Sequence, residues 1–208
     1  MSKKLTIYVD LDNTLLDTFV GAYEFSKRFI YGGDLIDNAS LSTKLHPPKE
    51  KDIINYSTTS YLQACGMTRN EAILMRQYLF HSIDYWRTLP FMPGAKDVFK
   101  WMCERHEVYI VTSTFLSKAD ECVLGKIRFI EEKLPWFDMK NLIYSHAKHK
   151  LTGDVFIEDV WSQIETFNGA RVLMDQPYNR DAKSDLRVFN WEEIKNYIKY
   201  LEKKLATI

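Results

Sequence analysis

Short apolar runs rich in β-branched and aromatic residues recur along this sequence, and they restrict its fold more than any other feature. Four are clear and a fifth is weaker: 4–10, 107–113, 154–159 and 170–175, then 141–145. Such runs are typical of strands buried on both faces of a parallel sheet. Helical spacing of apolar residues is found at 94–106, 116–134 and 190–205. Alternating strands and helices predict an α/β fold with a doubly wound parallel sheet.

The interval from residue 18 to residue 92 interrupts this alternation. It contains no run that resembles a strand, and helical patterns lie near 14–30, 50–64 and 69–84. We therefore predict two parts, a helical insertion over 18–92 and an α/β core formed by 1–17 and 93–208.

Composition and charge argue against several functions. The 28 basic and 28 acidic residues sum to a net charge of zero, which gives no general attraction to nucleic acid or an anionic membrane. The three cysteines form no C-x-x-C pair, as expected for reduced thiols in the cytoplasm. No apolar run approaches the roughly 18 residues of a membrane span. We expect a cytoplasmic protein without nucleic-acid or membrane partners, and the sequence leaves open whether it forms a homodimer.

The first apolar run, Leu5–Val9, is followed by two carboxylates, Asp10 and Asp12. Side chains alternate along an extended segment, so these two are expected to point the same way at the carboxyl end of the strand. Open α/β sheets bind ligands at that edge. Two carboxylates in one crevice repel each other, and a hard divalent cation such as Mg²⁺ would offset the repulsion.

The same two carboxylates can divide the chemistry of phosphate-ester cleavage. A carboxylate bound to Mg²⁺ beside a phosphate can attack phosphorus and form an acyl phosphate. A second carboxyl group can donate a proton to the leaving oxygen and later take one from water. A structural role is the alternative, because Asp12 or Asn13 could cap the helix that follows.

Several segments resemble the motifs of the haloacid dehalogenase (HAD) superfamily of phosphohydrolases, and they follow one another in the same order. The segment "YVDLDNTLLD" is similar to the first motif. The segment "VYIVTS" resembles the second, an apolar strand that ends in Thr112, with Ser113 next. The segment "GDVFIEDV" resembles the fourth, with the acidic pair Glu158 and Asp159.

The superfamily also places a lysine between the second and fourth motifs, and this sequence offers several. Lys148 stands five residues before Gly153 and ten before the acidic pair, which is the spacing of the subfamily described below. Lys150 is the alternative in the same segment, and Lys118 and Lys126 follow the second motif.

The resemblance implies a role for each of these residues and a Rossmann-like core with a helical cap over 18–92. Asp10 would be the nucleophile and Asp12 the general acid and base. Mg²⁺ would be held by the carboxylate of Asp10, the backbone carbonyl of Asp12 and Asp159. The phosphate would be bound by hydroxyl, backbone N–H and ammonium groups of Thr112, Ser113 and Lys148.

Within the superfamily, "YWRTLPFMPGAKDVFKWM" and "KHKLTGDVFIED" look like segments of the 5′(3′)-deoxyribonucleotidases. This narrower resemblance implies hydrolysis of deoxyribonucleoside monophosphates. In that family aromatic rings stack around the base, at positions comparable to Phe19 and Phe80. All such rings could instead form the core of the cap, and the further aromatic candidates are Tyr56, Tyr61, Tyr85 and Trp86.

Two positions depart from that family. The acidic pair begins with Glu158 where the family commonly has two aspartates, and His146 stands where the family can have arginine. They leave the role of Glu158 and the base preference open. The leading hypothesis is a Mg²⁺-dependent nucleotidase that acts on deoxyribo- or ribonucleoside monophosphates through an aspartyl phosphate. The alternatives are a HAD phosphatase for another small phosphate ester, such as a sugar phosphate or phosphoglycolate, and a catalytically silent HAD domain that binds a ligand.

Overall fold

A computed structural model describes residues 4–31, 44–114 and 119–206 of the chain. The chain divides into two compact units, which we describe separately. The sheet unit comprises residues 1–16, 91–113 and 136–208. The helical unit comprises residues 17–90 and 114–135.

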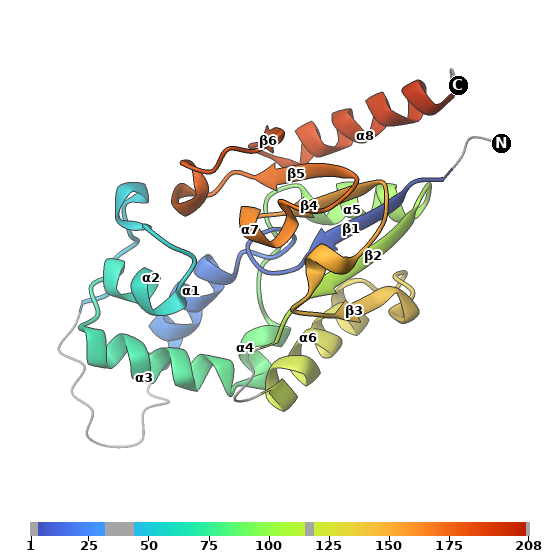
Figure 1. The fold of residues 1–208 in the computed structure, drawn as a ribbon. Coiled ribbons are helices and arrows are strands. Elements are labelled where there is room, and N and C mark those ends of the chain that lie inside the picture. Colours follow the sequence, from blue (N-terminus) through green and yellow to red (C-terminus); the bar gives the residue numbers. More distant parts are fainter. Residues whose placement is uncertain (1–3, 32–43, 115–118, 207–208) are drawn as a thin grey trace. The chain divides into compact units, whose positions relative to one another are not determined.

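The sheet unit is built on six parallel strands in the order β3-β2-β1-β4-β5-β6 (Figure 1). Their bounds are Thr6–Asp10 for β1, Glu107–Thr112 for β2, Leu142–Tyr144 for β3, Val155–Glu158 for β4, Ala170–Met174 for β5 and Leu186–Val188 for β6. The five predicted strands are present, and the α/β class with a parallel sheet is confirmed. β6 was not predicted, because its three residues include Arg187 and therefore form no apolar run.

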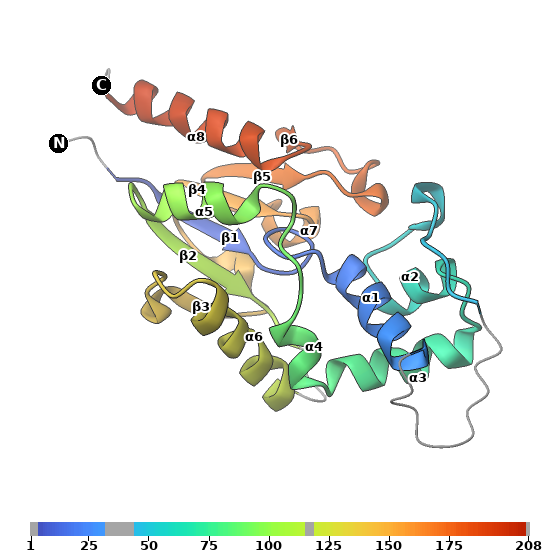
Figure 2. The same ribbon diagram turned by 180° about the vertical axis from the view of Figure 1, so that it is seen from behind.

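Helices cover both faces of this sheet. The helices of the unit are α5 (Ala95–Cys103), α7 (Trp161–Ile164) and α8 (Trp191–Ala206), with 3₁₀ turns at Met139–Asn141, Lys148–Lys150 and Pro177–Asn179. The two opposite views show α5 and α8 on one face and α7 on the other (Figures 1 and 2). The chain runs from β1 through β2 to β3 and then returns to β4 on the other side of β1, a change of direction that is typical of doubly wound sheets.

The central strand β1 places apolar side chains in both layers, as its sequence predicts. Ile7 and Val9 are fully buried, and Tyr8 between them points to the opposite face. There Tyr8 packs against Phe156 of the neighbouring strand β4, with ring centroids 5.6 Å apart, and edge-on against Phe167. The core therefore holds β1 from both sides and fixes where its carboxyl end lies.

The helical unit contains no strand among its described residues. Its elements are α1 (Thr18–Tyr31), a 3₁₀ turn (Glu50–Asp52), α2 (Thr58–Ala64), α3 (Arg69–Phe80), α4 (Ile83–Arg87) and α6 (Ala119–Lys133). The helix expected near 50–64 is interrupted, and the one expected near 69–84 is divided at His81 into α3 and α4. The described helices include none that is long and apolar enough to cross a membrane.

The first helix begins later than its apolar pattern suggested. Residues 11–16 form a tight turn in which the amide of Leu16 donates to the carbonyl of Leu11 at 2.8 Å. Asn13 in this turn has φ of 53°, a left-handed conformation that asparagine tolerates better than most residues. The cap of α1 is Asp17, whose side chain accepts from the amide of Val20 at 2.8 Å. Neither Asp12 nor Asn13 takes the capping role considered as their structural alternative.

The compact units differ from the predicted division at α6, which belongs to the helical unit rather than to the core. Arg87 of α4 donates to Glu132 of α6 at 2.8 Å. Gly125 allows the close approach of the two helices, because a Cβ atom there would lie 2.5 Å from Cβ of Trp86. Local sequence periodicity carries no information about this packing partner.

Candidate active site

Three neighbouring strands end in polar residues at the same edge of the sheet. Asp10 is the last residue of β1, Thr112 the last of β2 and Glu158 the last of β4, and Asp159 follows β4 directly. Parallel pairing of β1 with both neighbours brings these ends together, with Asp10 opposite Val111 in the β1–β2 register. This is the edge at which open α/β sheets bind ligands.

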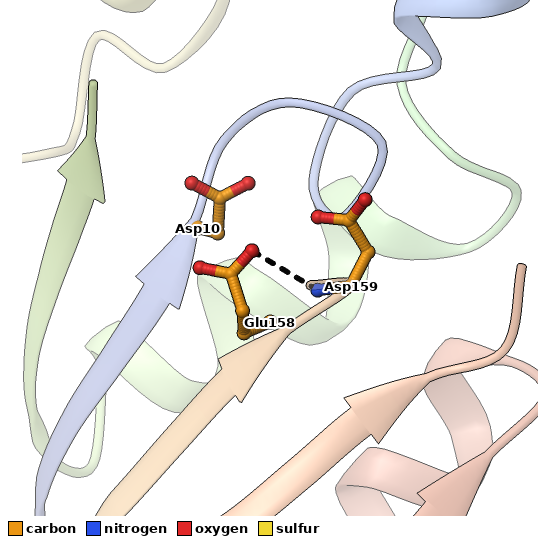
Figure 3. A group of neighbouring side chains, drawn as sticks. All are labelled: Asp10, Glu158 and Asp159. Carbon is orange, nitrogen blue, oxygen red and sulfur yellow. Dashed lines mark hydrogen bonds between the residues drawn. The ribbon is translucent and has the colours of Figure 1, made fainter. Parts of the chain in front are cut away.

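Asp10, Glu158 and Asp159 form a buried acidic cluster (Figure 3). One carboxylate oxygen from each lies within 4.8 Å of those of the other two. The exposed fractions of the three residues are only 4%, 1% and 3%. Like charges at this spacing and depth disfavour ionisation unless cations offset them.

Lys148 supplies one such cation. It lies in the 3₁₀ turn Lys148–Lys150, is buried, and its ammonium group donates to Asp10 Oδ1 and, at 2.6 Å, to Glu158 Oε2. Lys150 in the same turn is exposed. Lys148 is therefore the lysine that the structure brings to the predicted nucleophile. Of the other two candidates, Lys126 belongs to α6 and lies over the ring of Trp86, and Lys118 lies outside the described residues.

The pKa values of the cluster reflect its burial. Burial, followed by repulsion from Glu158, raises the pKa of Asp10 to about 7, although Lys148 opposes the shift. Burial also raises the pKa of Glu158 to about 8 and that of Asp159 to about 6. For Lys148, burial acts to lower the pKa, but the charges of Asp10 and Glu158 hold it above its ordinary value.

The charge balance and the donor atoms fit a hard divalent cation. Three ionised carboxylates and one ammonium group carry a net charge of −2 (three negative charges less one positive), which a divalent cation would cancel. All the ligand atoms offered by this cluster are carboxylate oxygens, the type that Mg²⁺ prefers. The buried cluster could hold a metal ion of this kind.

Glu158 has a different set of partners from the other two acids. Its Oε2 accepts from Lys148, and its Oε1 accepts from the amides of Asp159 and Val160, both at 3.2 Å. These contacts orient the lysine and the chain after β4. Asp159 instead accepts from the hydroxyl groups of Thr14, at 3.3 Å, and Tyr178. Asp10 also contacts Lys148, so Glu158 differs from it in the two backbone amides that its second oxygen accepts. Asp10 and Asp159 are the other candidates for metal ligands.

The remaining predicted residues of the sheet unit lie near these strand ends in the sequence. Asp12 is half-buried in the turn after β1 and forms an isolated bridge with Leu16. Thr112 is fully buried, and its hydroxyl group donates to the carbonyl of Ser113 at 3.4 Å. Ser113 follows β2 and is half-buried.

The two predicted aromatic residues belong to the helical unit. Phe19 has an exposed fraction of 5% and stacks on Tyr61, with centroids 4.4 Å apart and ring planes within 10°. Phe80 is half-buried and tilts against Trp86, with centroids 5.3 Å apart. Of the other candidates, Tyr61, Tyr85 and Trp86 are buried and Tyr56 is exposed. One face of Phe19 is therefore covered by another ring of its own unit.

A polar turn after β5, residues 176–179, was not predicted from the sequence. Tyr178 donates to the Asp159 carboxylate, and the side-chain amide of Asn179 donates to the Asp159 carbonyl at 2.7 Å. The side-chain amide of Gln176 donates to the carbonyl of Asn13 at 2.8 Å. The segment "QPYN" follows a predicted strand, so the argument applied to the other strand ends would have pointed to it.

Comparison with known proteins identifies the family. Residues 4–205 match the family described as 5′ nucleotidase, deoxy (pyrimidine), cytosolic type C protein. The chain belongs to this family. It is 30% identical to a 5′(3′)-deoxyribonucleotidase of Bacillus subtilis over 146 residues, which cover 70% of this chain and 78% of that protein. It is 28% identical to a 5′(3′)-deoxyribonucleotidase of Clostridium acetobutylicum over 195 residues, which cover 92% and 93% of the two chains.

The solved structures agree at the level of the fold. A HAD-hydrolase of Bacillus subtilis, solved bound to magnesium, superposes with a TM-score of 0.55 at 14% identity, covering 94% of this chain and 99% of that one. The predicted HAD-like fold is thus confirmed. As a member of the nucleotidase family, the chain is a phosphoric monoester hydrolase of the nucleotidase type.

Proposed function

We propose that this family member is a Mg²⁺-dependent nucleotidase that removes phosphate from deoxyribo- or ribonucleoside monophosphates through an aspartyl phosphate. The observation that carries the proposal is the placement of Asp10 at the end of β1, buried against Lys148 and beside Asp159. The similarity to 5′(3′)-deoxyribonucleotidases of Bacillus subtilis and Clostridium acetobutylicum supports the substrate class.

In the proposed reaction, a carboxylate oxygen of Asp10 attacks phosphorus while the bond between phosphorus and the ester oxygen breaks. Asp12 donates a proton to the leaving oxygen of the nucleoside. Asp12 then takes a proton from water, and the resulting hydroxide attacks phosphorus. The bond between phosphorus and Asp10 breaks, which releases inorganic phosphate and restores both carboxyl groups.

The residues present fit a magnesium ion. The Asp10 and Asp159 carboxylates and the backbone carbonyl of Asp12 would hold it, as oxygen ligands on two adjacent strand ends. When bound, Mg²⁺ would neutralise negative charge on the transferring phosphoryl group. Glu158 keeps Lys148 in place by the hydrogen bond at 2.6 Å, and so it acts in this proposal as a positioning residue.

The phosphate would be bound by three residues of the sheet unit. Lys148 is already within hydrogen-bonding distance of Asp10, so its ammonium group is suited to contact the phosphoryl oxygens during the attack. The hydroxyl and backbone N–H groups of Thr112 and Ser113 would bind the remaining oxygens at the end of β2.

For the base, we propose contacts with the aromatic rings of Phe19 and Phe80 in the helical unit. Stacking on such rings contributes about 1–3 kcal/mol per base and tolerates different bases. Support comes from the concentration of aromatic side chains around them, with Tyr61 beside Phe19 and Trp86 beside Phe80.

The decisive experiment measures phosphate release from a panel of substrates with Mg²⁺ and with EDTA. The panel contains 5′ and 3′ deoxyribo- and ribonucleoside monophosphates, a sugar phosphate and phosphoglycolate. We expect the highest kcat/KM with nucleoside monophosphates, loss of activity in EDTA and its recovery with Mg²⁺. Preference for the sugar phosphate or phosphoglycolate would contradict the substrate class, and full activity in EDTA would contradict the metal site.

A further inference from the structure

The turn that follows β5 contacts both segments that carry the proposed catalytic carboxylates. Tyr178 of this turn donates its phenolic hydrogen to Asp159, at the end of β4. The side chain of Asn13, in the turn after β1, hydrogen-bonds to the same tyrosine. Gln176 donates to the carbonyl of Asn13 at 2.8 Å. One short turn thus connects the two strand ends that would hold the metal.

Further hydrogen bonds, made by Asn179 and Arg187, hold the turn in place. The side-chain amide of Asn179 donates to the carbonyls of Asp159 and Met174, at 2.7 and 2.8 Å. Arg187 of β6 donates to the side-chain and backbone oxygens of Asn179, at 2.7 and 3.0 Å, and to Asp175 at 2.9 Å. These hydrogen bonds anchor Asn179, the residue next to Tyr178, and so restrict how far the hydroxyl group of Tyr178 can move away from Asp159.

Asp159 needs such a donor because its neighbours are mostly acids. The lysine of the site contacts Asp10 and Glu158. The other hydroxyl group on Asp159, that of Thr14, lies at 3.3 Å, which is long for a bond between two oxygens. A carboxylate has room for about four hydrogen bonds or metal contacts, so a donor on one oxygen leaves lone pairs for a cation.

We propose that Tyr178 is a positioning residue for magnesium binding: its hydroxyl group fixes the orientation of the Asp159 carboxylate, and the turn 176–179 thereby sets the affinity for the metal. This proposal rests on the proposed function, because it takes Asp159 as a ligand of Mg²⁺. Outer partners of this kind orient metal ligands, and their loss typically costs about 10–100-fold in metal affinity.

The test compares Tyr178→Phe with a matched control, Tyr8→Phe. Each removes one hydroxyl group from the sheet unit, and the Tyr8 hydroxyl donates to the carbonyl of Thr152 at 3.0 Å. Mg²⁺ is titrated into the metal-stripped full chain, and binding is followed by calorimetry and by the rise in melting temperature. We expect Tyr178→Phe to weaken Mg²⁺ binding about 10–100-fold and Tyr8→Phe to leave it within about twofold of the wild type.

Three outcomes would overturn the proposal. They are equal Mg²⁺ affinity in Tyr178→Phe and the wild type, equal weakening in both variants, and no Mg²⁺ binding by the wild type. The melting temperatures in EDTA show whether each variant is folded. Because binding is measured without substrate, a wild type that binds Mg²⁺ but hydrolyses no nucleoside monophosphate would refute the proposed function and leave the comparison of the two variants valid.

Discussion

Replacing the proposed nucleophile by its amide, Asp10→Asn, should abolish turnover and stabilise the metal-free protein. The fold buries Asp10 almost completely beside Glu158 and Asp159. Asparagine keeps the shape of the side chain and an oxygen that can accept from Lys148, but it removes the charge. The pKa of Asp10, raised to about 7 in spite of Lys148, indicates that burial and repulsion outweigh the attraction of the lysine.

The magnitude follows from that pKa. Each pH unit between the ordinary value of 3.8 and the folded value of about 7 corresponds to about 1.4 kcal/mol. Because the folded pKa is raised, folding is favoured at low pH and loses stability as pH rises toward the folded pKa. Relative to a side chain that does not titrate, Asp10 therefore costs the folded state about 4 kcal/mol at pH 8, where it stays ionised, and about 2 kcal/mol at pH 5, where it must take up a proton on folding. Asp10→Asn should raise the free energy of unfolding by these amounts.

The assay is urea unfolding in EDTA at both pH values, with phosphate release measured in parallel. Exposed Asp181 gives the control Asp181→Asn, which should change the free energy of unfolding by less than about 0.5 kcal/mol. Adding Mg²⁺ should stabilise the wild type and so reduce the difference in free energy of unfolding between the wild type and Asp10→Asn. An Asp10→Asn protein that is less stable than the wild type at pH 8 would show that Lys148 dominates, and near-normal turnover would refute the covalent mechanism.

Three further predictions concern the metal, the base and the sheet. Asp159→Ala should raise the Mg²⁺ concentration needed for half-maximal activity more than Glu158→Ala does, and the reverse order would exchange their assigned roles. Phe19→Ala and Phe80→Ala should each lower kcat/KM for a deoxynucleotide by roughly 5–150-fold relative to p-nitrophenyl phosphate. Equal losses of kcat/KM on both substrates, with a large fall in melting temperature, would assign the rings to the core. Gly169→Ala should destabilise the protein by about 1–3 kcal/mol in urea unfolding, because its Cβ would lie 2.4 Å from a backbone oxygen, and unchanged stability would contradict that contact.

The residues of the site differ in how far local pattern could identify them. Asp10 and Asp159 each follow an apolar run, and the carboxyl ends of parallel strands meet at one edge of the sheet. Periodicity therefore predicted one edge of the sheet for both, the resemblance to the HAD motifs predicted that they share a site, and the adjacent positions of β1 and β4 bring them together. Lys148 was predictable only by resemblance to a family, because Lys150 has the same local surroundings. In the structure Lys148 is buried and contacts Asp10, which lies 138 residues away in the sequence, whereas Lys150 is exposed.

The helical part shows the limits of periodicity more clearly. The patterns near 69–84 and 116–134 indicated helices, and α3, α4 and α6 are helical. That α6 joins the helical unit depends on Gly125 and on the contact between Arg87 and Glu132, which come from separate segments. Whether Phe19 faces a base or the core depends likewise on its neighbour, and its ring stacks on Tyr61.

The amino-acid sequence was sufficient for the α/β class, the strand ends that carry carboxylates and the type of chemistry, because these depend on short-range alternation and on motifs within a few residues. Tertiary structure alone assigned Glu158 to Lys148 and Tyr178 to Asp159. Both assignments depend on side-chain geometry at adjacent strand ends. Hydrogen bonds and burial act over a few ångströms in space, whatever the separation along the chain. No local pattern could therefore specify that Asp10 and Glu158 contact Lys148 while Asp159 contacts Tyr178.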